Sequence, residues 1–118
     1  MEIKIAEFKN QKIADLTSEK NIIKNAQDAL ELLMNCIYQG SNKIVISEAN
    51  LPADFFDLKT GLAGDILQKF SNYEGYLAIV GDYSKYTSNS LKAFIYESNK
   101  QKRISFVSSK EEAIEALL

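Results

Sequence analysis

The run Tyr76-Leu77-Ala78-Ile79-Val80 decides the fold class of this chain. It is almost wholly apolar and has the length of a strand, which is typical of a central strand covered on both faces. Ile44-Val45-Ile46, bounded by Asn42 and Asn50, has the same character. A segment with apolar residues at helical spacing lies between the two runs. This alternation predicts right-handed crossovers and a mostly parallel sheet.

Elements before this centre can be predicted from periodicity and capping residues. Apolar residues alternate with polar ones over residues 3–8, and a turn at residues 9–11 would return residues 12–17 as an antiparallel edge hairpin. Asn25 can cap a first helix that Gly40 ends. We expect its buried stripe to consist of Ala26, Ala29, Leu30, Leu33, Met34 and Ile37. Cys36, near this stripe, is interpreted as a small core residue.

A second helix is predicted from about Leu58 to Tyr73, with Gly75 as its end. Its expected stripe consists of Leu62, Ile66, Leu67, Phe70 and Tyr73. Thr87 or Ser88 can cap a third helix, residues 104–107 read as a strand, and Ser109-Lys110-Glu111-Glu112 is a capping box that opens a last helix. The predicted order is β-β-α-β-α-β-α-β-α, which describes one α/β domain over residues 1–118. We expect helices mainly on one face and an antiparallel strand at one edge.

Composition excludes several classes of function. The chain has 118 residues, a net charge of −2, no histidine and one cysteine. The lack of histidine excludes Ser-His-Asp and Cys-His catalysis, and we predict no metal site and no cofactor. A net negative charge argues against a nucleic-acid partner and against a polybasic membrane anchor. No apolar run approaches the ~20 residues that span a bilayer, and no signal-peptide core is present, so we expect a cytoplasmic protein without membrane partners.

Two polar loops follow the central strands, at residues 47–57 and 81–87. Ligands and partners of open α/β sheets dock at the carboxyl ends of the strands, where both loops should meet. Their carboxylates match the spacing of no metal-binding loop. The basic cluster at residues 100–103 is interpreted as a solvated turn.

The stretch Phe55-Phe56-Asp57-Leu58-Lys59-Thr60-Gly61-Leu62-Ala63-Gly64 is the most unusual part of the chain. At least one of Phe55 and Phe56 should cover the sheet, and the other could be an exposed anchor for a partner. Thr60 is expected in the first turn of the second helix, where capping by Asp57 or Thr60 is the simplest interpretation. Each helical glycine costs ~1 kcal/mol relative to alanine, so Gly61 and Gly64 require either close packing against a neighbour, which we favour, or an approaching partner.

This stretch, with residues 66–70 and 78–86, resembles a bacterial family of uncharacterised proteins, a domain-of-unknown-function family. More distantly, the element order is similar to the STAS domain of anti-sigma factor antagonists, which bind a kinase-type anti-sigma factor. In those domains a Ser or Thr at the start of the second helix is phosphorylated. Thr60-Gly61-Leu62 is similar to the end of their Asp-Ser-Ser-Gly-Leu motif, which implies Thr60 as a phosphorylation site. Asp57 lies one position too early, and Leu58 and Lys59 depart from the motif.

These observations favour a non-enzymatic regulatory or protein-interaction module of STAS-like fold. Two alternatives stay open. One is a small-molecule or nucleotide-derivative binding protein, or an enzyme, that uses Asp82, Ser84, Lys85 and Tyr86. The other is a structural homodimer that pairs through a strand edge or Phe residues. The predicted partner-binding surface consists of Phe55, Phe56, Asp57, Lys59, Thr60, Gly61, Gly64, Asp82, Tyr83, Ser84 and Tyr86.

Overall fold

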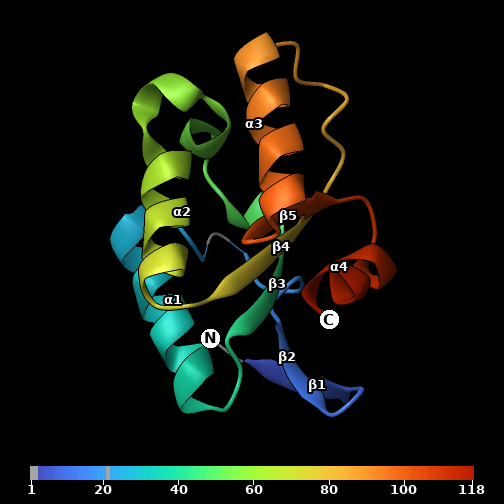
Figure 1. Cartoon of the computed structure of the whole chain (residues 1–118). Coiled ribbons are helices and arrows are strands. Elements are labelled where there is room, and N and C mark those ends of the chain that lie inside the picture. Colours follow the sequence, from blue (N-terminus) through green and yellow to red (C-terminus); the bar gives the residue numbers. More distant parts are fainter. Residues whose placement is uncertain (1–2, 21) are drawn as a thin grey trace.

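The computed structural model describes residues 3–20 and 22–118 (Figure 1). This part of the chain forms five strands and four α-helices, in the predicted order. The elements are β1 (Lys4–Phe8), β2 (Gln11–Asp15), α1 (Ala26–Tyr38), β3 (Lys43–Ser47), α2 (Leu62–Asn72), β4 (Tyr76–Val80), α3 (Asn89–Gln101), β5 (Ile104–Val107) and α4 (Lys110–Leu117). Three short 3₁₀ helices, Glu48–Asn50, Ala53–Phe56 and Leu58–Thr60, lie between β3 and α2.

The strands form one sheet in the order β1-β2-β3-β4-β5. β1 pairs antiparallel with β2, and the other three pairs are parallel. The predicted α/β class, with an antiparallel edge strand on a mostly parallel sheet, is therefore confirmed. The turn of the edge hairpin holds Lys9 and Asn10 at φ values of 49° and 66°, which suit the right-handed twist of the flanking strands.

Helices cover the two faces of the sheet unequally, and each strand sends alternate side chains to opposite faces. α1, α2 and α3 lie on one face, and α4 lies on the other (Figure 1). Ile44, Ile46 and Leu77 belong to the large core under the three helices, whereas Val45 and Ala78 contact α4 residues on the opposite face. Burial on both faces explains why the three central residues of β3 and of β4 are all apolar.

The buried stripe of α1 differs from the prediction. Leu32 and Cys36 are buried, whereas Met34 and Ile37 are 37% and 39% exposed. The expectation that Met34 and Ile37 lie in the core is therefore wrong. α1 is apolar over more than one stripe, and packing against the sheet and α2 selects the one through Ala29, Leu32, Leu33 and Cys36. The core position of Cys36 is confirmed, and burial raises the pKa of its thiol to about 11.

α2 begins at Leu62, not at Leu58 as predicted. The residues before it form a separate 3₁₀ turn, because Gly61 adopts a left-handed conformation with φ of 79° and breaks the helix there. Tyr73 caps the other end and is 48% exposed, so its predicted place in the stripe is wrong. Gly75 follows at a point of close packing, since a Cβ atom there would lie 2.6 Å from Cδ1 of Leu33.

The predicted starts of α1, α3 and α4 are confirmed by their capping bonds. The backbone N–H of Asp28 donates to Oδ1 of Asn25 at 2.8 Å. Oγ of Ser88 and Oγ of Ser109 accept in the same way from helix amides three residues later. In the described part of the chain, no helix is both long enough and apolar enough to cross a membrane.

Candidate functional site

The carboxyl ends of β3, β4 and β5 meet beneath an aromatic cluster. Six rings from separate parts of the chain form this cluster: Phe55, Phe56, Tyr83, Tyr86, Phe94 and Phe106. Phe56 stacks on Tyr86 with ring centroids 4.8 Å apart and planes 12° from parallel. Tyr83 meets Phe106 edge-on at 5.4 Å. The cluster therefore joins the loop before α2 to the loop after β4, as expected from their positions after neighbouring strands.

Both Phe55 and Phe56 belong to the core. Phe55 is fully buried and Phe56 is 9% exposed. The expectation that one of them lies exposed as a partner anchor is therefore wrong. The short 3₁₀ helix Ala53–Phe56 directs both rings into the core. There Phe55 packs against Phe106, and Phe56 stacks on Tyr86.

Glu48 forms a second link between the two loops. Its Oε2 lies 2.8 Å from Nζ of Lys85, and its Oε1 accepts a hydrogen bond from the backbone N–H of Asp82 at 3.1 Å. Gly81 leaves room for this carboxylate, since a Cβ atom there would lie 2.8 Å from Cδ of Glu48. The hydrogen bond to Glu48 raises the pKa of the Lys85 ammonium, so Lys85 stays protonated at neutral pH.

Asp82, Tyr83 and Ser84 form hydrogen bonds with residues close in sequence. Oδ1 of Asp82 accepts from both the backbone N–H and the hydroxyl of Ser84, and these bonds lower the pKa of the Asp82 carboxyl. The Tyr83 hydroxyl donates to the carbonyl of Ile79, and burial raises its pKa. A charged Lys85 cannot accept a proton from Ser84. These bonds hold the loop in one conformation.

Thr60 closes the turn that leads into α2. Its hydroxyl lies 2.7 Å from the carbonyl of Asp54 and 2.9 Å from that of Asp57, and it accepts the backbone N–H of Leu62 at 3.3 Å. Asp57 caps the preceding 3₁₀ turn through the N–H of Lys59. Asp57 thus caps the 3₁₀ turn and not α2, whose N-cap residue Gly61 has no side-chain capping bond, so the expected capping of the second helix by Asp57 or Thr60 is not found. Thr60 precedes α2 instead of lying in its first turn.

The exposed side chains above the aromatic cluster form what we call the carboxyl-edge surface: Asp54, Asp57, Lys59, Thr60, Asp82, Ser84 and Lys85. Tyr83 and Tyr86 are half-buried beneath it. Within residues 3–20 and 22–118, no three Asp, Glu or Cys side chains lie close enough together to hold a metal ion. The charged side chains of the carboxyl-edge surface are therefore available as separate polar contacts.

The sequence prediction missed one part of this edge. A hollow of about 410 Å³ next to Gly81 and Asp82 is also lined by Ser108 and Glu112. Ser108 donates its hydroxyl to the Glu112 carboxylate. Their position directly after β5, a strand parallel to β4, was the signal that could have placed them at the same edge.

The two glycines of the unusual stretch have different roles. Gly61 supplies the left-handed residue before α2, as described above. Gly64 lies within α2, is exposed, and has no atom within 4 Å of the position of an added Cβ. The favoured explanation of these glycines, close packing against a neighbouring element, is therefore wrong for both, since an added Cβ at Gly61 would also meet nothing within 4 Å.

Alanine substitutions at these glycines should change stability in opposite directions. Gly61→Ala should lower the free energy of unfolding by about 1 kcal/mol, because a Cβ strains the left-handed conformation. Gly64→Ala should raise it by about 1 kcal/mol, since alanine is the better helix former and meets no neighbour here. Urea denaturation of the two variants measures both effects. Equal signs would contradict these roles.

Comparison with known proteins identifies the family of this chain. No curated protein matches the sequence. Among solved structures, the chain is similar to the crystal structure of a proposed anti-sigma factor antagonist from Thermotoga maritima, with 16% sequence identity and a TM-score of 0.49 over 98% of this chain and 93% of that chain. The family model described as domain of unknown function DUF4180 matches residues 8–117. The resemblance to a domain-of-unknown-function family is thus confirmed, and the chain belongs to the DUF4180 family.

Proposed function

We propose that this protein is a non-enzymatic interaction module with a regulatory role, and that it binds a protein partner through the carboxyl-edge surface. One observation carries the proposal: direct contacts fix the loops 47–57 and 81–87 to each other, while their outward polar side chains stay exposed. The Phe56–Tyr86 stack and the Glu48–Lys85 pair supply these contacts. Preorganised loops lose little conformational entropy on binding, which favours affinity.

The charges of this surface indicate the partner's chemistry. Asp54, Asp57 and Asp82 are exposed around a smaller number of lysines. A partner with Lys or Arg at its rim would therefore be steered toward this edge. The half-buried rings of Tyr83 and Tyr86 would provide apolar contact beneath the polar groups.

Inverting the charge pattern of the surface should weaken binding. The double variant Asp54→Lys/Lys59→Glu keeps the net charge but exchanges the signs, and neither side chain is needed to hold the two loops together. We expect a loss of about tenfold or more in affinity for the partner, because like charges would oppose each other across the interface. The measurement is quantitative affinity capture from the native host, followed by titration of the captured protein.

The matched control is Glu97→Lys/Lys100→Glu, which makes the same exchange on exposed positions near the end of α3. Binding should be retained in this variant. The proposed surface would be wrong if both double variants lost the partner equally, or if neither did.

Phosphorylation of Thr60 is a second part of the proposal. The side chain is exposed, and its hydroxyl hydrogen closes the turn on the carbonyls of Asp54 and Asp57. A phosphate would replace that hydrogen and add nearly two negative charges next to two carbonyl oxygens. It would therefore open the turn and change the surface that the partner contacts.

Three variants separate the hydroxyl from the charge. Thr60→Ser keeps the donor and should behave as the parent protein. Thr60→Val removes the hydrogen bonds and should lower the free energy of unfolding by about 1 kcal/mol. Thr60→Glu should in addition lower partner affinity in the titration above. Phosphopeptide mapping of protein from the native host should find the phosphate on Thr60; a phosphate found elsewhere, or none under any growth condition, would contradict this part.

A homodimer is the remaining structural alternative. The outer edge of β5 is blocked at Phe106, whose backbone N–H and carbonyl both bond to the side-chain amide of Asn99. Pairing of two copies through a strand edge would therefore have to use β1. The same side-chain amide protects β5 against unwanted strand pairing.

A further inference from the structure

Gly64 has no structural explanation within the fold. It lies inside α2, where glycine is about 1 kcal/mol less favourable than alanine. Its φ is not left-handed, and an added Cβ would meet nothing within 4 Å. A small residue at such a site leaves the helix backbone open to something that approaches it from outside.

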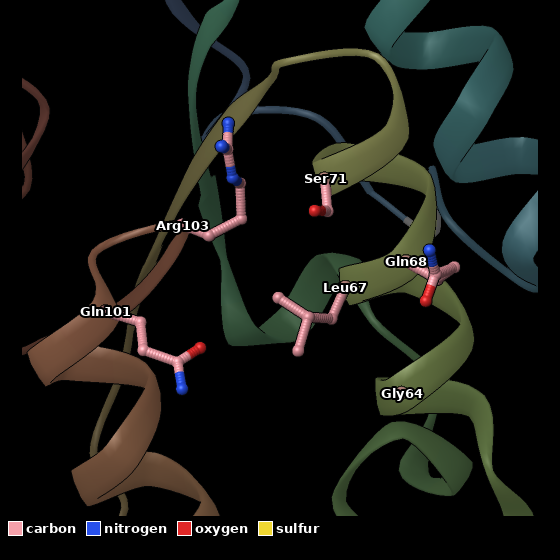
Figure 2. Close-up of a pocket in the computed structure, with 6 residues that line it drawn as sticks. All are labelled: Gly64, Leu67, Gln68, Ser71, Gln101 and Arg103. Carbon is pink, nitrogen blue, oxygen red and sulfur yellow. The ribbon is translucent and has the colours of Figure 1, made fainter.

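Gly64 lines a groove between α2 and the end of α3 (Figure 2). The groove has a volume of about 350 Å³ and is lined by Gly64, Leu67, Gln68, Ser71, Gln101 and Arg103. This volume lies at the lower end of the range for small-molecule sites. The groove is separate from the carboxyl-edge surface, although α2 borders both.

The lining of the groove carries polar side chains at one end and has no side chain at the other, where Gly64 lies. Figure 2 shows Arg103 and Ser71 at one end, Gly64 at the opposite end, and Leu67 pointing into the space between them. Gln68 and Gln101 add amide groups along the sides, and the lining contains no carboxylate. An anionic group is therefore not repelled by any lining residue.

Arg103 is fixed in place but retains most of its hydrogen-bonding capacity. One of its five N–H donors bonds to the carbonyl of Gly75 at 2.9 Å, and the guanidinium lies 4.4 Å from the centre of the Tyr76 ring. Neither of the two ion pairs in the described residues involves Arg103. A half-buried, oriented and unpaired guanidinium suits a carboxylate or a phosphate, which it can hold with two parallel hydrogen bonds.

We propose that the α2–α3 groove binds a small organic anion: a carboxylate or a phosphate on a compact apolar body. The anionic group bonds to Ser71 and to the N–H groups of Arg103 that Gly75 leaves free; Figure 2 shows this guanidinium directed away from Leu67 and Gly64. The apolar body lies over Leu67 and the bare backbone at Gly64, which explains why a side chain is absent there. Gln101 and Arg103, from the cluster 100–103 that was interpreted from the sequence as a solvated turn, thereby supply part of a binding site.

The test is a titration of the ¹⁵N-labelled protein, followed by NMR, with three probes that share a phenyl body: benzoate, phenyl phosphate and the neutral benzyl alcohol. We expect saturable shifts of the backbone signals of Gly64, Gln68 and Gln101 with at least one of the two anions, and none with the alcohol. The anion that binds more tightly identifies the ligand's charged group.

Three variants locate the binding. Arg103→Gln should weaken the tighter anion about tenfold, the usual size of a lost charge-assisted contact. Lys100→Gln removes a nearby charge that does not line the groove and should change the affinity less than about twofold. Gly64→Leu fills the groove without touching Arg103 and should abolish the shifts, while the remaining spectrum shows that the fold is intact.

The proposal is overturned if neither anion gives saturable shifts at the groove. It is equally overturned if Gly64→Leu binds as the parent protein does, or if Lys100→Gln and Arg103→Gln weaken binding alike, since the attraction would then be a general charge effect.

Discussion

The stack of Phe56 on Tyr86 is the contact on which the carboxyl edge of this molecule depends. It joins a loop that follows β3 to a loop that follows β4, and neither loop has regular strand or α-helical structure to hold it. Aromatic pairs of this kind add about 0.5–1.5 kcal/mol beyond the area they bury. Glu48 strengthens the same junction through Lys85 and the Asp82 amide. The exposed groups above are therefore held at fixed positions.

The fold could be predicted from the sequence wherever local chemistry determines structure. Apolar runs predicted β3 and β4. The side-chain oxygens of Asn25, Ser88 and Ser109 predicted the starts of α1, α3 and α4, because capping involves only neighbouring residues. The facing stripe of α1 could not be predicted. Its helix has apolar residues on two adjacent stripes, and contacts with distant elements decide which one is buried.

The site was predicted less completely, for the same reason. Its location followed from the rule that loops after parallel strands meet at one edge. The burial of Phe55 and Phe56 did not, because the rings that cover them, Tyr86 and Phe106, belong to later parts of the chain. The different roles of Gly61 and Gly64 could not be predicted from the sequence either. Gly61 needs a left-handed backbone and Gly64 borders a groove, and both features depend on the three-dimensional structure.

Amide hydrogen exchange, measured by NMR, tests most directly whether the two loops form one unit. Exchange in residues 53–61 and 81–88 should be compared between the parent protein, Phe56→Leu and Tyr86→Leu, each of which removes one ring of the stack. Our account predicts that either substitution accelerates exchange in both loops together, while the amides of β3 and β4 remain protected. If each substitution loosens only its own loop, the loops are independent and the carboxyl edge is not a single preorganised surface.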